Sequence, residues 1–82
     1  MSACYKDNKE FEWGRYFGRN LQRMLHKKEI DQGYLAKQLE STDAMISRYV
    51  HGTSIPSVYK VARIAEILNC DISELVKINY ED

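Results

Sequence analysis

One short segment of the chain, residues 43–48, combines side chains that could read the edges of DNA base pairs. Residues three and four positions apart share one face of a helix, and that face carries Asp43, Ala44, Ser47 and Arg48. The planar guanidinium of Arg48 is suited to the O6 and N7 acceptors of guanine. Ala44 could contact a thymine methyl group, and Asp43 could accept a hydrogen bond from cytosine N4. The segment therefore predicts a helix with a base-reading face.

Simpler roles for these side chains remain open. Arg48 could instead bind a DNA phosphate or form an ion pair within the protein. Asp43 would lie in the first turn of the helix, where a carboxylate could serve only the helix dipole. Ile46, together with Tyr49 or Val50, falls on the opposite arc, as expected for a helix with one buried face.

The elements that must position this segment are all helices. Apolar residues recur at helical spacing almost everywhere, and no stretch alternates convincingly. We expect a first helix over residues 11–28, and a capping residue begins each later helix: Asp31, Thr42, Ser57 and Asp71. Gly52 and Asn69 tolerate the left-handed conformation and are expected to end the third and fourth helices.

One face of each helix supplies the expected core. The inward side chains are Trp13, Phe17, Leu21, Met24 and Leu25 in the first helix, Leu35, Ala36 and Leu39 in the second, Val61, Ile64, Ala65 and Leu68 in the fourth, and Ile72, Leu75 and Val76 in the fifth.

Length and composition indicate one small globular domain. The 82 residues leave room for a single core, and 44% hydrophobic with 29% charged residues are ordinary globular values. No apolar run approaches the roughly 18 residues of a membrane span, and the N-terminus lacks a secretory signal. We expect a cytoplasmic protein with no membrane partner, divided into an N-terminal tail or helix extension (1–12), a domain (13–78) and a C-terminal tail (79–82).

The net charge of zero first argues against a nucleic-acid partner. Twelve basic and twelve acidic residues balance over the whole chain, but residues 13–63 contain nine basic and four acidic residues. The middle of the chain is therefore basic and its ends are acidic. Part of this charge is a row at four-residue steps, Arg15, Arg19 and Arg23, which could also be only a solvated face. Neutrality thus does not exclude DNA.

No residue pattern indicates catalysis. Cys4 and Cys70 lie far apart, without a second Cys or a His at metal-binding spacing, so both are expected to be free thiols. The chain also lacks a paired acid and base or a phosphate-binding loop. We expect no enzymatic activity, no metal, no cofactor and no small-molecule substrate.

The second and third helices are joined by Glu40, Ser41 and Thr42, the spacing of a helix-turn-helix. Four stretches of sequence surround this turn: Asp31-Gln-Gly-Tyr-Leu-Ala-Lys-Gln-Leu, Met45-Ile-Ser-Arg-Tyr-Val-His-Gly, Ile55-Pro-Ser and Ile64-Ala-Glu-Ile-Leu-Asn-Cys-Asp-Ile-Ser-Glu-Leu. In this combination, over roughly residues 17–76, the chain resembles the phage repressor and Cro-like helix-turn-helix family, also called the xenobiotic response element (XRE) type.

The resemblance implies an all-α, five-helix lambda-repressor-like domain with the helix-turn-helix at helices two and three. It implies a small transcriptional regulator, a repressor, that binds double-stranded DNA as a homodimer on a palindromic operator. Asp43, Ala44 and Arg48 match base-contacting positions, and Ser47 shares their arc. The expected DNA-backbone contacts are Gln32, Lys37, Thr42, His51, Thr53 and Tyr59, although Gln32 could be only a solvated residue at a helix start.

Two features qualify this expectation. The family usually has glycine and then an apolar residue in the turn, where this chain has Glu40 and Ser41. A left-handed residue other than glycine is strained by about 1 kcal/mol, so we expect the turn to differ. Neutrality and Asp43 also favour an alternative, a protein-interaction module such as an antitoxin or anti-repressor.

A dimer interface would have to come from the ends of the chain or from the fifth helix. The apolar residues available there are Phe11, Trp13, Tyr16, Val76, Ile78 and Tyr80. They could equally form a satellite of the core.

Overall fold

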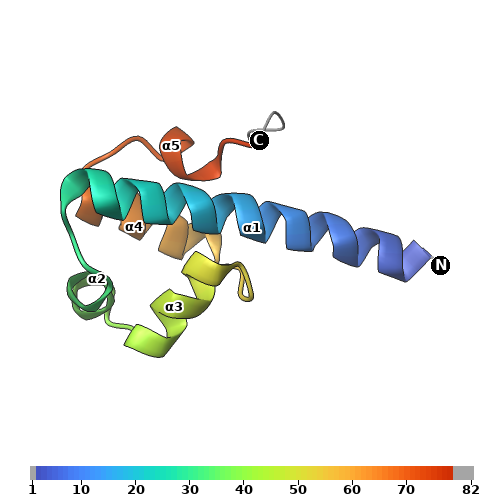
Figure 1. The fold of residues 1–82 in the computed structure, drawn as a ribbon, viewed down its shortest axis with the longest axis horizontal. Helices are drawn as coiled ribbons and strands as arrows, with labels where there is room; N and C mark the ends of the chain where they lie inside the picture. Colours follow the sequence, from blue (N-terminus) through green and yellow to red (C-terminus); the bar gives the residue numbers. More distant parts are fainter. Residues whose placement is uncertain (1, 79–82) are drawn as a thin grey trace.

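Helices account for all the regular structure in the described chain. The computed structural model describes the backbone of residues 2–78 and the side chains of residues 12–78. Within them lie α1 (Ser2–Lys28), α2 (Gln32–Leu39), α3 (Asp43–His51), α4 (Val58–Leu68) and α5 (Ser73–Val76) (Figure 1). The all-α, five-helix prediction is confirmed. The first helix begins at Ser2, well before the expected residue 11, and its N-terminal part extends beyond the other helices.

The core is built from one face of every helix. The buried apolar side chains are Phe17, Leu21, Met24, Leu25, Leu35, Ala36, Leu39, Ile46, Tyr49, Val61, Ile64, Ala65, Leu68 and Leu75. Trp13 is partly buried and stacks on Phe17, with ring centroids 5.4 Å apart. Tyr49 contacts the Phe17 ring edge-on, with ring centroids 6.4 Å apart. Val76 packs against this core, but Ile72, expected to face inward, is 43% exposed.

The predicted caps hold at three of four helix starts. Asp31 Oδ1 accepts from Tyr34 N (2.7 Å), Thr42 Oγ1 from Met45 N (3.1 Å), and Ser57 Oγ from Lys60 N (3.2 Å). The prediction for Asp71 is wrong. An N-cap residue normally has an extended backbone, whereas Ile72, the residue before α5, is already helical and makes no side-chain cap. Asp71 instead accepts with its main-chain oxygen from Glu74 N (2.9 Å).

The turn between α2 and α3 keeps the left-handed geometry despite having no glycine. Glu40 has φ 59° and ψ 45°, so the expectation that the turn would differ is wrong. Two hydrogen bonds stabilise it, from Ser41 N to Ala36 O (2.8 Å) and from Glu40 N to Lys37 O (3.2 Å). This pair is a Schellman motif. Glu29 and Asn69 are also left-handed, and so is Gly52, which ends α3 as predicted.

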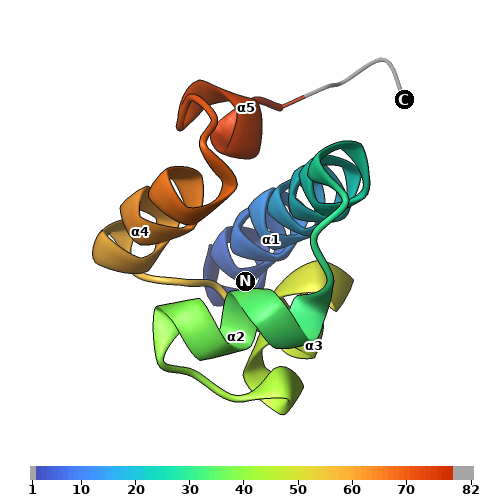
Figure 2. The ribbon, with the colours of Figure 1, turned by 90° about the vertical axis from the view of Figure 1, so that its left-hand side faces the viewer.

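Asn20 fastens α5 to α1. Its side chain is 4% exposed, and Nδ2 donates to Leu75 O (2.9 Å) and to Lys77 O (2.8 Å). These bonds satisfy carbonyl groups at the end of α5, which is too short to pair all its own groups. Figure 2 shows the result: α5 lies at one end of the molecule, and α2 and α3 lie together at the other.

Two further expectations concern the membrane and the cysteines. Among the described residues, no helix combines the length and apolar character needed for a bilayer crossing. Cys70 is a free, half-buried thiol packed against the core, and burial raises its pKa. The side chain of Cys4 lies outside the described residues.

Candidate nucleic-acid interface

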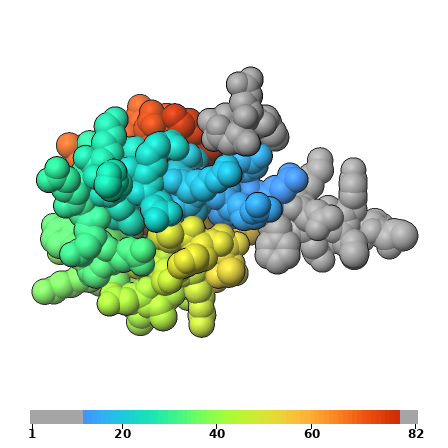
Figure 3. Space-filling model, in the orientation of Figure 1, coloured from blue at the N-terminus to red at the C-terminus, as the bar shows by residue number. Residues whose placement is uncertain are grey.

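The helix-turn-helix is held by the core on one side and open on the other. Ile46 and Tyr49 anchor α3, with exposed fractions of 0% and 4%, so the predicted buried arc is confirmed. The C-terminal end of α3 meets α1, while its N-terminal end lies away from α1 (Figure 1). In the space-filling view, α2 and α3 form a continuous lower surface (Figure 3). Their outer faces are therefore presented together.

The structure brings the four predicted base-contacting residues onto this open face. Asp43, Ala44 and Arg48 are exposed, and Ser47 is half-buried. The ion pairs among described residues are Arg63–Glu66 and Lys77–Glu74, so Arg48 has no carboxylate partner there. Its guanidinium thus keeps its donors for an external acceptor. Asp43 is in the first turn of α3, a position that suits either a base contact or the helix dipole.

His51 is oriented by its own helix. Its Nδ1 lies 2.8 Å from Ser47 O and 3.3 Å from Ser47 Oγ. A carbonyl oxygen only accepts, so Nδ1 carries the proton in the shorter contact. Nε2 is then the ring nitrogen left for a contact outside the protein.

The two threonines at the ends of α3 differ in what their hydroxyl groups can do. Thr42 Oγ1 accepts from Met45 N, which leaves its own proton free to donate to a phosphate. Thr53 Oγ1 donates to Arg48 O at 3.3 Å, so its proton is used within the protein. Of the two predicted contacts, Thr42 is the better placed donor.

The remaining predicted contacts lie on α2 and α4. Gln32 is the first residue of α2 and half-buried, and Lys37 is exposed in its last turn. Tyr59 is 68% exposed. It lies one turn before Arg63 in α4 and contributes to raising the pKa of Arg63.

Arg63 is tied to its surroundings on α4 and α2. Nη1 donates to Glu66 Oε1 at 2.7 Å, and Nη2 lies 3.5 Å from Gln38 O at the end of α2. The bond to Glu66 raises the pKa of Arg63, with a smaller effect from Tyr59. Tyr59 is therefore associated with Arg63, which itself reaches the end of α2.

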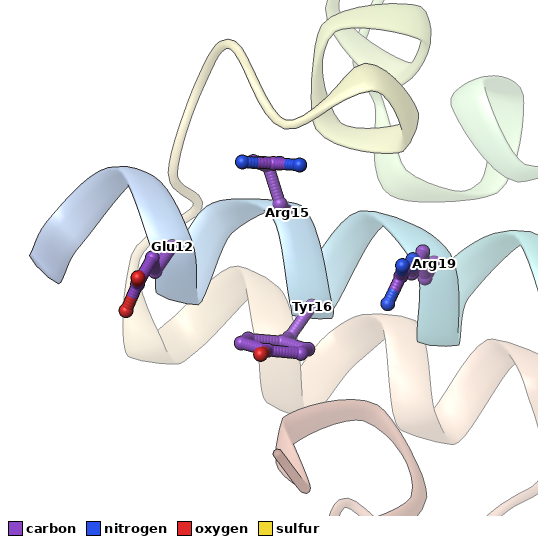
Figure 4. A pocket seen from close by; sticks show the side chains of 4 residues that line it. All are labelled: Glu12, Arg15, Tyr16 and Arg19. Carbon is purple, nitrogen blue, oxygen red and sulfur yellow. The ribbon is translucent and has the colours of Figure 1, made fainter. Parts of the chain in front are cut away.

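Arg15 is a candidate DNA contact that the sequence alone did not single out from the row of arginines in α1. Its Cα and Cγ would lie 3.0 and 3.1 Å from a Cβ at Gly52, so its stem crosses the end of α3. Figure 4 shows its side chain directed toward the loop that follows α3, while Tyr16 lies on the other side of α1. Arg19 instead lies over the Tyr16 ring, 5.8 Å from its centroid. The sequence signal was a set of glycines, Gly14 and Gly18 near Arg15 and Gly52 at the end of α3, which permit this close approach.

Most of the described residues that could form a dimer interface already pack against other parts of the same chain. Trp13 and Val76 pack against the core, and Arg19 covers Tyr16. Ile78 is 38% exposed. The side chains of Phe11 and Tyr80 lie outside the described residues.

The chemistry of the face is that of hydrogen bonding and charge. In the described part of the chain, no three His, Cys, Asp or Glu side chains are grouped as metal ligands. An exposed guanidinium, hydroxyl groups and a lysine ammonium match the acceptors of bases and phosphates.

Comparison with known proteins bears on the same region. The family model of the Cro/C1-type HTH DNA-binding domain matches residues 20–81, which include all of α2, the turn and α3. A search of curated proteins found no significant match.

Proposed function

The chain belongs to the Cro/C1-type helix-turn-helix DNA-binding domains, a non-enzymatic family, and on this premise we propose that it is a small transcriptional regulator acting in the cytoplasm. It binds a specific double-stranded DNA sequence as a homodimer and represses transcription from the site that it covers. The observation that supports this proposal most strongly is the exposed Arg48 on α3, which has no carboxylate partner among the described residues.

Base readout is assigned to the outer arc of α3. Arg48 donates to guanine O6 and N7, Ala44 contacts a thymine methyl group, and Asp43 accepts from cytosine N4. Ser47, half-buried on the same arc, donates to a base only at close approach. Each good bidentate contact discriminates by about 1–3 kcal/mol.

Phosphate contacts hold α3 in register without selecting sequence. Lys37 and Thr42 supply them from α2 and the turn, and Gln32 supplies one from the start of α2. His51 and Arg15 supply them from the other end of α3. Tyr59 lies at the margin, and Thr53 supplies one only when its hydroxyl group leaves Arg48 O. This division predicts that the phosphate-contacting residues determine how DNA affinity depends on salt, and that the outer arc of α3 determines the preference among sequences.

The outer arc of α3 is too short to specify a DNA site alone, which favours a dimer. A helix of nine residues touches few base pairs, whereas a genome offers about 10⁶–10⁹ competing sites. Two copies related by a twofold axis would read two half-sites about 34 Å apart, and their specificities would combine. The operator would therefore be palindromic.

Two measurements test this function. Fluorescence anisotropy with a random duplex should show an affinity that falls steeply as salt rises, because phosphate contacts release counterions. Selection of bound sequences from a random duplex pool should then yield a palindrome. Failure to bind any duplex at low salt would refute the proposal.

The second candidate is a protein-interaction module, such as an antitoxin or anti-repressor. It is favoured by Asp43, an exposed carboxylate on the face that would approach negatively charged DNA, and by the zero net charge. Its test is Asp43→Asn. This change should strengthen non-specific DNA binding if α3 faces DNA, and should weaken only the protein complex if α3 faces a basic partner.

A further inference from the structure

Glycines allow the main chain of α1 to approach the main chain of α3 closely. A Cβ at Gly18, in the middle of α1, would overlap Val50 O and lie 2.7 Å from Tyr49 O. Both oxygens belong to the last turn of α3. A real Cβ essentially never approaches another atom so closely, so an alanine at position 18 could not fit without movement.

Two more glycines extend this contact. A Cβ at Gly14, one turn earlier in α1, would lie 3.2 Å from Gly52 O, and a Cβ at Gly52 would lie 3.0 Å from Arg15 Cα. We call Gly14, Gly18 and Gly52 the glycine seat. Gly52 also needs its φ of 77° to end α3, whereas Gly14 and Gly18 have ordinary helical conformations. The two glycines of α1 are therefore explained by proximity to α3.

We propose that Gly18 is a positioning residue for DNA binding, because it fixes where α3 stands relative to the rest of the domain. This inference rests on the proposed function. The atoms that meet position 18 are main-chain oxygens, which cannot rotate away as a side chain could. A larger residue must therefore displace the end of α3 itself.

Such a displacement would act on base readout more than on phosphate contact. The N-terminal end of α3 is held by the Thr42 cap and the turn to α2, so moving only its C-terminal end changes the tilt of the helix. Arg48 lies in the displaced half. Hydrogen bonds weaken outside a narrow range of distance and angle, whereas the attraction of a lysine to the DNA backbone falls off over about 10 Å.

The test is a graded series of glycine-to-alanine variants. Gly18→Ala introduces the severe overlap, Gly14→Ala the milder one, and Gly33→Ala is the matched control. A Cβ at Gly33 would lie 3.5 Å from Asp31 Oδ1, an ordinary contact. Binding to the selected duplex and to a random duplex would be measured below the unfolding transition, and amide NMR spectra would report the position of α3.

We expect Gly18→Ala to weaken binding to the selected duplex by roughly 10-fold, the loss of about one good base contact. Binding to the random duplex should change less than about 3-fold, since phosphate attraction tolerates a small shift. The affinity of Gly14→Ala for the selected duplex should lie between those of Gly18→Ala and the Gly33→Ala control. If Gly18→Ala does not fold, the comparison of Gly14→Ala with Gly33→Ala tests the proposal.

Equal losses on both duplexes, or wild-type affinity in folded Gly18→Ala, would overturn the positioning role. Amide shifts provide a readout that does not require DNA. Shifts along α3 in Gly18→Ala support the glycine seat, and shifts confined to α1 contradict it. If the wild-type protein binds no duplex, the proposed function fails while these spectra still decide whether Gly18 positions α3.

Discussion

Replacing Asn20 by leucine should destabilise the fold through two carbonyl groups at the end of α5. Leucine has the same branching and number of side-chain heavy atoms as asparagine but no donor, so Leu75 O and Lys77 O both lose their partner. The bond to Leu75 O is buried, and an unsatisfied buried acceptor costs about 1–3 kcal/mol. The bond to Lys77 O is partly buried, so water can replace it at a net cost of about 1 kcal/mol. The expected loss is about 2–4 kcal/mol.

Urea denaturation followed by circular dichroism measures this loss, and Gln22→Leu provides the control. Gln22 is exposed on the same helix, where a substitution is usually worth less than about 0.5 kcal/mol. In a domain of this size, each kcal/mol shifts the thermal midpoint by about 4–8 °C. Asn20→Leu should therefore melt at least about 6 °C below Gln22→Leu. Equal stability of the two variants would refute the role of Asn20 in holding α5.

Two substitutions and one alkylation measurement test other parts of the molecule. Glu40→Gly should stabilise the protein by about 0.5–1 kcal/mol in urea denaturation, because relief of the left-handed conformation exceeds the added chain entropy of glycine; a loss of stability would contradict this. Lys37→Ala should weaken binding to all duplexes alike and lower the slope of log affinity against log salt by about one, as titrations at several salt concentrations would show. Because burial raises the pKa of Cys70, its alkylation at pH 8, followed by peptide mass spectrometry, should be slower in the folded protein than in urea. Equal rates would mean that the thiol is not desolvated.

Helix starts were predictable where a local side chain determines them. Asp31, Thr42 and Ser57 each accept from an N–H three residues ahead, an interaction that needs no tertiary contact. Asp71 failed because α5 is a single turn whose start depends on its packing. Glu40 shows the opposite case, since hydrogen bonds of the completed turn offset a conformation that the residue alone disfavours.

The candidate interface was predictable in its outline but not in its tertiary parts. Helical spacing alone placed Asp43, Ala44 and Arg48 on the exposed side of α3, opposite Ile46. It could not show that Arg15 crosses the end of α3, nor that Asn20 is buried. Both depend on which faces of distant segments meet. The glycines near Arg15 permit a close approach there, but they do not identify the segment that approaches.

In the proposed function, Arg48 reads a base from the exposed face of α3. The most direct test compares the sequences selected from a random duplex pool by the wild-type protein and by Arg48→Ala. Loss of the guanine preference at one position in each half-site, with the other positions unchanged, is the predicted result. An unchanged sequence preference with a uniformly lower affinity would show that Arg48 contacts only phosphate, and would contradict the claim.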